Sequence, residues 1–171
     1  MIFNLFLIFA ILFLLFFLSM IWPPDSPWAP WWRTDSSVAE RICRLANVKR
    51  GEVIYELGSG DAQTLIAAAK TFNAKGVGIE IDPLRVFISK FFLRIKGLTK
   101  DVRIIRGNFF EEDLSKADVI FVYLVPKTLD KLLPKFRKEL KKGTRIVSYR
   151  YKMKLKEVKV DKELQLYLYI I

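Results

Sequence analysis

The sequence contains no histidine and only one cysteine, Cys43. An intrachain disulfide, a zinc site built from cysteine and histidine, and every catalytic triad with a histidine base are therefore excluded. Charge is also missing from the start of the chain, because no lysine or arginine precedes Arg33 and Asp25 is the first acidic residue. We expect no metal site, and we expect chemistry that does not depend on a histidine general base.

Residues 1–22 form one apolar run in which only Asn4 and Ser19 are clearly polar. At about 1.5 Å per residue, a helix of this length covers the roughly 30 Å hydrocarbon core of a bilayer. A cleaved signal peptide is disfavoured because no basic residue precedes the run and no small residues end it. A buried core helix is disfavoured because the run is apolar on every face. The sequence predicts one transmembrane helix over residues 1–22.

The basic residues lie after this run, since all 29 lysines and arginines fall from Arg33 onward in a chain of formal net charge +11. This asymmetry predicts a single-pass membrane protein whose C-terminal domain is cytoplasmic. Residues 23–36, rich in proline and tryptophan, predict an interfacial linker before a domain over residues 37–171. The basic excess fits a solvated surface or contact with anionic lipid of a bilayer, whereas nucleic acid is not expected because aromatic and basic residues are not interleaved.

Strand and helix patterns alternate through the rest of the chain. Apolar runs predict strands over residues 53–57, 75–81, 102–106, 119–125 and 145–150, followed by a terminal hairpin over 157–160 and 164–171. Helical spacing separates these strands, and Pro134 is expected to kink or divide the helix that precedes Gly143. The pattern predicts an α/β fold with a doubly wound, mostly parallel seven-stranded sheet and helices on both faces.

Two acidic residues and a glycine turn lie at the predicted carboxyl ends of the first two strands. Glu56 precedes Gly58-Ser59-Gly60, and Glu80 stands at the end of the second strand. In doubly wound sheets ligands bind at this edge, where small residues allow close approach and a carboxylate accepts hydrogen bonds from ribose hydroxyls. A nicotinamide fingerprint fails, because Gln63 occupies its third glycine position. The sequence therefore predicts a nucleotide-type site without that fingerprint.

Four segments together resemble the class I S-adenosylmethionine-dependent methyltransferases, and imply their Rossmann-like fold. The segments are ELGSGDA (56–62), GVGIEID (76–82), RIIRGNFFEEDL (103–114) and ADVIFVYLVP (117–126). More narrowly, the combination is similar to the small membrane-anchored lysine methyltransferases that include the ATP synthase c-subunit enzyme of mitochondria and its prokaryotic relatives. The resemblance covers nearly the whole chain, and it implies S-adenosylmethionine as cofactor.

The resemblance also assigns roles to individual residues. It implies a cofactor site made of Glu56, Gly58, Ser59, Gly60, Asp61, Glu80, Ile81, Asn108, Phe109 and Tyr123. Tyr123, Val125 and Pro126 would line the catalytic mouth without acting as a general base, and Thr34 in the linker would close it. Two features depart from the family pattern. Ala62 and Gln63 stand where relatives carry glycine and arginine, and Asn108 replaces an acid.

The predicted activity is methylation of a protein lysine, with a membrane-associated protein as substrate. Transfer from a sulfonium to a neutral amine requires mainly alignment and exclusion of water. Tyr123 could steady the methylammonium through a cation–π contact, or simply pack in the sheet. Two other interpretations stay open: methylation of a lipid or small membrane-soluble molecule, and a non-catalytic, membrane-tethered module that binds the cofactor.

Overall fold

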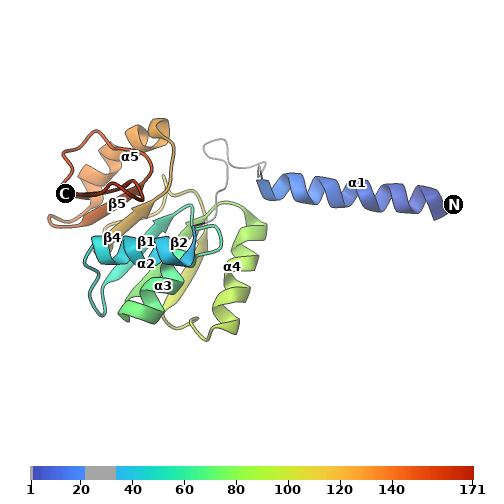
Figure 1. Cartoon of the computed structure of the whole chain (residues 1–171), viewed down its shortest axis with the longest axis horizontal. Helices are drawn as coiled ribbons and strands as arrows, with labels where there is room; N and C mark the ends of the chain where they lie inside the picture. The colour runs from blue at the N-terminus through green and yellow to red at the C-terminus, as the bar shows by residue number, and fades with distance from the viewer. Residues whose placement is uncertain (1, 22–33) are drawn as a thin grey trace.

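A computed structural model describes residues 2–21 and 34–171 of the chain (Figure 1). Its helices are α1 (Ile2–Ile21), α2 (Ser36–Leu45), α3 (Gln63–Phe72), α4 (Pro83–Ile95) and α5 (Pro126–Glu139). Its strands are β1 (Val53–Leu57), β2 (Lys75–Glu80), β3 (Val102–Arg106), β4 (Val119–Val122), β5 (Arg145–Tyr149), β6 (Lys159–Asp161) and β7 (Leu166–Ile170).

The strands form one seven-stranded sheet in the order β3-β2-β1-β4-β5-β7-β6. Strands β1 to β5 pair in parallel, whereas β7 runs antiparallel to β5 and to β6. The predicted mostly parallel sheet with a terminal hairpin is thereby confirmed. Strand order reverses between β1 and β4: β2 and β3 are added to one side of β1, and β4 and the later strands are added to its other side. Ligands of doubly wound sheets bind beyond the carboxyl ends of the strands at such a point.

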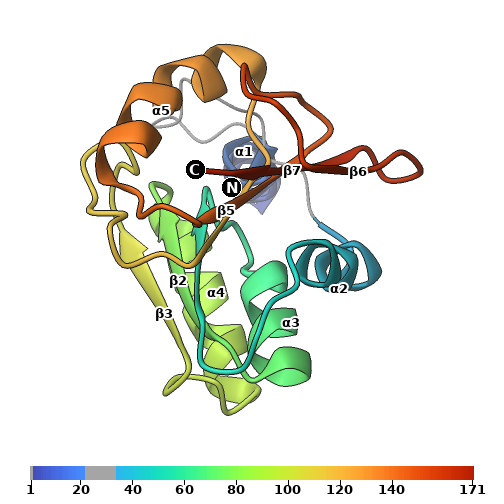
Figure 2. The same ribbon diagram turned by 90° about the vertical axis from the view of Figure 1, so that its left-hand side faces the viewer.

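Two apolar cores cover the two faces of the sheet. One core joins the sheet to α2, α3 and α4 through side chains such as Ile42, Leu65 and Leu93. The other joins it to α5 through Leu129, Leu132 and Phe136. Figure 2 shows α5 on one side of the strands and α2, α3 and α4 on the opposite side. The strands β1 and β4 are buried on both faces, which explains their almost continuous apolar sequence.

Local signals set the ends of α4. The Asp82 side chain accepts hydrogen bonds from the amides of Leu84 at 2.8 Å and Arg85 at 3.3 Å, and Pro83 occupies the first helical position. Gly97 follows the helix with a positive φ of 68°. In α5, by contrast, the helix runs through Pro134 as one element, so the expected division does not occur. Its buried apolar face continues on both sides of the proline and stabilises the helix there.

The prediction of a transmembrane helix over residues 1–22 is corrected. A helix, α1, does form there and carries exposed apolar side chains from Leu5 to Phe16. However, across residues 2–21 and 34–171 no helix satisfies the length and apolarity required to cross a bilayer.

The predictions that depended on that helix change with it. The single-pass membrane protein with a cytoplasmic catalytic domain is not supported, because its spanning helix is not found among the described residues. The interfacial linker over residues 23–36 lies mostly outside the described residues, which resume at Thr34.

Phe136 offers a direct test of the core between α5 and the sheet, because its side chain is fully buried. Phe136→Ala should destabilise the fold by about 3–5 kcal/mol, which lowers the melting temperature by roughly 6–20 °C in a chain of this size. The exposed Lys138 on the same helix supplies the control. Lys138→Ala should change the free energy of unfolding by no more than about 0.5 kcal/mol. Equal melting temperatures for the two variants would contradict this account of the core.

Candidate functional site

The loop from β1 to α3 folds over the end of β2. The amides of Gly58 and Ser59 both donate to the carbonyl of Ile79, at 2.8 and 3.1 Å. Gly58 and Gly60 have positive φ angles of 77° and 51°, which glycine adopts without steric cost. Ala62, at the start of α3, also has a positive φ of 61°. The predicted glycine turn is therefore present, and it places its backbone beside the second strand.

Glu80 ties this loop to the following one. One of its carboxylate oxygens accepts a hydrogen bond from the Gly60 amide at 2.8 Å, and the other accepts from the Asp82 amide at 3.0 Å. The residue is 5% exposed. The Glu80 carboxylate thus links the loop after β1 to the loop after β2. Ile81 lies between Glu80 and Asp82 in the sequence. A carboxylate has about four acceptor positions, so two remain for further donors.

Glu56 lies beneath the start of α3 and is buried. Its Oε2 has no hydrogen-bond partner among the described residues, and the same holds for the hydroxyls of Ser59 and Thr64. Burial raises the pKa of the Glu56 carboxyl well above its ordinary value, and the nearby Asp61 and Glu80 carboxylates raise that pKa further. Three unpartnered polar groups gathered at one loop are unusual in a folded interior, and they indicate a binding site.

The glycine in the middle of β2 makes room for this arrangement. Gly78 lies beside Glu56 in the parallel register. A Cβ at Gly78 would stand 2.6 Å from the Ser59 hydroxyl and 2.7 Å from Ile104 Cδ1. The absence of a side chain at this position is what allows the Ser59 side chain to lie in the loop.

The turn after β3 holds Asn108 and Phe109. The Asn108 side chain accepts from the Phe110 amide at 3.1 Å and donates to Glu111 at 2.8 Å. The ring of Phe109 contacts that of Phe110 in a tilted arrangement, with centroids 4.9 Å apart, and it packs against the core on the α5 face. The Gly107 amide donates to the Glu80 carbonyl at 3.0 Å, which places this turn next to the end of β2.

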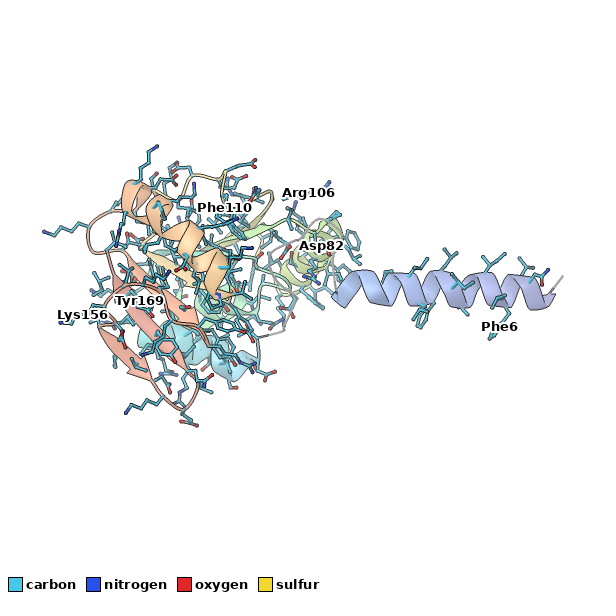
Figure 3. All side chains as sticks on the ribbon, turned by 90° about the horizontal axis from the view of Figure 1, so that it is seen from above. Phe6, Asp82, Arg106, Phe110, Lys156 and Tyr169 are labelled. Carbon is cyan, nitrogen blue, oxygen red and sulfur yellow. The ribbon has the colours of Figure 1, made fainter. Side chains whose placement is uncertain are left out.

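Residues after β4 form the other wall of the site. Leu124 lies close to the glycine loop, since a Cβ on Gly58 would be 3.8 Å from its Cδ2. Val125 caps α5, where its carbonyl accepts from Thr128 and Leu129, and Pro126 is the first residue of that helix. Figure 3 shows Asp82 and Arg106 on one side of the domain, with Lys156 and Tyr169 on the opposite side. The carboxyl ends of β2 and β3 therefore share one edge.

Tyr123 belongs to a cluster that the sequence analysis missed. Its ring lies 4.6 Å from that of Tyr149 and 6.5 Å from that of Tyr151, measured between centroids. The guanidinium of Arg150 stands over two of these rings, at 5.8 Å from Tyr123 and 5.4 Å from Tyr149. The signal was present as the close spacing of two tyrosines at the end of a strand, but its relevance depended on the pairing of β4 with β5.

Other features of the described residues lie outside this set of contacts. Thr34 is buried just before α2, and its closing of the mouth stays a prediction. Hollows of about 530 and 820 Å³ lie at the opposite edge, near the amino ends of the strands. No group of three or more metal-ligating side chains occurs within the part of the chain that the structure describes.

Comparison with known sequences identifies a family match at this site. The profile of the ANTKMT methyltransferase domain matches residues 56–160, a segment that contains Glu56, Glu80, Tyr123 and Tyr149. The match covers more than half of the chain.

Curated relatives include a protein-lysine N-methyltransferase of Saccharolobus islandicus (strain REY15A), which is 38% identical over 79% of this chain and 83% of its own length. The lysine N-methyltransferase of the ATP synthase c-subunit from Mus musculus is 26% identical over 68% of this chain. That match spans only 46% of the mouse protein, and the Caenorhabditis elegans protein of the same name is spanned to 60%. The chain thus covers about half the length of these animal relatives.

Among solved structures, an RNA methyltransferase from Salinibacter ruber in complex with S-adenosyl-L-homocysteine has a TM-score of 0.79 and 37% sequence identity. The similarity covers 82% of this chain and 94% of that one. The C-terminal domain of precorrin-6Y C5,15-methyltransferase from Rhodobacter capsulatus has a TM-score of 0.61 at 19% identity, covering 75% and 70% of the two chains. The second likeness concerns the fold alone.

Glu56→Gln tests the cost of the buried carboxyl. Because the folded-state pKa of Glu56 is raised, this residue contributes stability that is present below the ordinary glutamate pKa of 4.5 and is lost as the pH rises through the raised value. The variant should therefore melt at a higher temperature than the parent near neutral pH, by roughly 2–4 °C for each ~1 kcal/mol regained. Its stability should also depend less on pH.

Thermal unfolding of ligand-free protein between pH 5 and pH 8 measures this effect. Glu163→Gln is the matched control, because the Glu163 side chain is 72% exposed and should keep the parental pH dependence. Identical pH profiles for Glu56→Gln and the parent protein would show that the buried carboxyl has no such cost.

Proposed function

Because this chain belongs to the ANTKMT methyltransferase domain family, we propose that it transfers methyl groups from S-adenosylmethionine to lysine side chains of a protein substrate. The protein-lysine N-methyltransferase at 38% identity supports this assignment of the acceptor. The observation that carries the proposal is the hydrogen bond between the Gly60 amide and the Glu80 carboxylate, 2.8 Å long. It brings the glycine loop and the acid at the end of β2 to one point.

The residues at this point fit the cofactor. Glu80 keeps free acceptor positions for the two ribose hydroxyls while its backbone contacts hold the loop in place. The unpartnered oxygens of Glu56, Ser59 and Thr64 are available to the charged methionine end. A cationic ammonium near Glu56 would favour its ionised form and thereby offset the cost of burial. Gly58 and Gly60 allow the backbone to approach the ligand closely.

Asn108 and Phe109 would border the adenine in this arrangement. They follow β3 and adjoin the end of β2, where Gly107 bonds to Glu80. The Asn108 carbonyl already accepts from the Phe110 amide, and an amide oxygen has a second lone pair for an adenine amine. Asp61 and Ile81 flank the two loops and complete the proposed cofactor contacts.

The chemistry requires little from the protein beyond alignment. The cofactor supplies a methyl group already activated on a sulfonium, so that the lysine nitrogen forms a bond to carbon as the carbon–sulfur bond breaks. The lysine must arrive neutral, and the walls formed by Tyr123, Val125 and Pro126 favour that form by excluding water. Burial raises the pKa of the Tyr123 hydroxyl, which keeps it a neutral hydrogen-bonding group rather than a base.

The structure of the Salinibacter ruber relative favours RNA as a second candidate acceptor. A net charge of +11 would assist contact with RNA. The narrower form of our first proposal is a membrane-associated protein substrate, with which the exposed apolar side chains of α1 are compatible. The acceptors therefore have to be compared directly.

The test is incubation of the full-length protein with methyl-labelled S-adenosylmethionine and separate soluble-protein, membrane-protein, lipid and RNA fractions. We expect label in protein, with mass spectrometry locating added methyl groups on lysine. Preferential labelling of the membrane-protein fraction would support the narrower proposal. Label confined to RNA or lipid would reject the lysine proposal, and label in no fraction would reject the enzyme itself.

Glu80→Gln should weaken cofactor binding about tenfold or more, because both carboxylate oxygens already accept backbone N–H groups. The amide nitrogen of the glutamine would face one of those donors and leave it unpaired. Calorimetric titration with S-adenosylmethionine measures the change, and Glu163→Gln serves as the exposed control. Unchanged affinity in Glu80→Gln would remove the central support for this site.

A further inference from the structure

Three tyrosines gather at the ends of β4 and β5, on the side of the sheet that holds Glu56. In the parallel register Val122 pairs with Ser148, so the next residues, Tyr123 and Tyr149, fall side by side. Both pack against the core on the α2 and α3 face. Tyr151 completes the group, with its ring 6.5 Å from that of Tyr123. The Arg150 guanidinium stands over the rings of Tyr123 and Tyr149, so the faces of these two rings are accessible to a cation.

The backbone that carries the last two rings is fixed by hydrogen bonds. The Arg150 amide donates to the Gln165 carbonyl at 2.8 Å, and the Tyr151 amide donates to the Tyr149 carbonyl at 2.8 Å. The Ser148 hydroxyl donates to the Tyr151 carbonyl at 2.6 Å. These contacts tie the turn to β5 and to the loop before β7. The tyrosines are therefore held by the sheet itself.

Arg150, between the two tyrosines, has a left-handed backbone with φ 63°. That conformation is unfavourable for most residues with a Cβ, whereas glycine and asparagine adopt it at lower cost. The exposed Arg150 side chain nevertheless lies over the rings of Tyr123 and Tyr149. Strain at a residue whose side chain lies at the candidate mouth points to a functional use of that side chain.

We infer that Tyr123, Tyr149 and Tyr151 form a binding site for an alkylammonium group, which Arg150 covers until the substrate lysine displaces its guanidinium. This inference rests on the proposed function and specifies how its acceptor is recognised. Methyl transfer moves the positive charge from the sulfonium to the lysine nitrogen, and tyrosine faces attract a cation there. Because every methylated form of lysine can carry this charge, the site retains the product amine for further methylation.

Binding of tetramethylammonium to the full-length protein tests the site without catalysis. This ion cannot donate an N–H hydrogen bond, so ring contacts dominate its recognition. Tyrosine ring resonances are followed by NMR during titration with tetramethylammonium chloride, at an ionic strength held constant with sodium chloride. Arg150→Met should bind the ion about threefold or more tightly than the parent, because the competing cation is gone.

Substitutions at Tyr149 test the contribution of an aromatic ring to the affinity for tetramethylammonium. Tyr149→Leu should lower the affinity for tetramethylammonium about threefold or more, whereas Tyr149→Phe, which keeps the ring, should stay near the parent. Lys152→Met is the matched control, because Lys152 stands over the ring of Tyr167 at 5.3 Å, outside the tyrosine cluster. Equal affinities for Tyr149→Leu and Tyr149→Phe, or no gain in Arg150→Met, would overturn the inference.

Kinetics with a lysine substrate give a second readout. Arg150→Met should lower KM severalfold, and Tyr149→Leu should shift the products from di- and trimethyl-lysine toward monomethyl-lysine. If lysine is methylated but Tyr149→Leu changes neither the product distribution nor the affinity for tetramethylammonium, the cation site is wrong and the proposed function stands. If no lysine is methylated while ion binding follows the expected series, the proposed acceptor is wrong and the alkylammonium site stands.

Discussion

The Glu80 carboxylate is the contact on which the candidate site depends. By accepting from the backbone amides of Gly60 and Asp82, it holds together two loops that leave adjacent parallel strands. The same Asp82 begins α4 through its own side chain, so the helix, the strand end and the glycine loop share one chain of hydrogen bonds. A hydrogen bond to a charged group is stronger than a neutral one, and burial strengthens it further. The loop geometry is thereby set before any ligand arrives.

The fixed geometry of these loops is accompanied by a local loss of stability at Glu56. A buried carboxyl with a raised pKa and two unpartnered hydroxyls nearby destabilise the ligand-free protein. The two apolar cores, one on each face of the sheet, outweigh that cost through burial of side chains from four helices. The two cores keep the domain folded, while the unpartnered polar groups of the glycine loop remain available to a ligand. A ligand that bonds to these groups gains hydrogen bonds that folding alone did not form.

The two groups of residues proposed to bind the cofactor and the substrate differ in chemical character. Around Glu56 and Glu80 the groups are acidic and polar, and they suit a cofactor with hydroxyls and an ammonium. Around Tyr123 and Tyr149 they are aromatic, and Arg150 already supplies a cation to their faces. The proposed methyl transfer would run from the first environment to the second.

By itself, the sequence determined the α/β alternation, the seven strands, the glycine turn and the positions of Glu56 and Glu80 at strand ends, because each of these follows from local spacing and composition. Local reasoning failed over residues 1–22, where an apolar run predicted a membrane crossing that the described residues do not support. The division that Pro134 could have caused does not occur, because packing of the buried face carries α5 through the proline as one helix. Only the tertiary structure placed Tyr149, Arg150 and Tyr151 beside Tyr123, because the register of β4 with β5 is set by side-chain packing across an intervening helix, and no pattern in either strand alone specifies it.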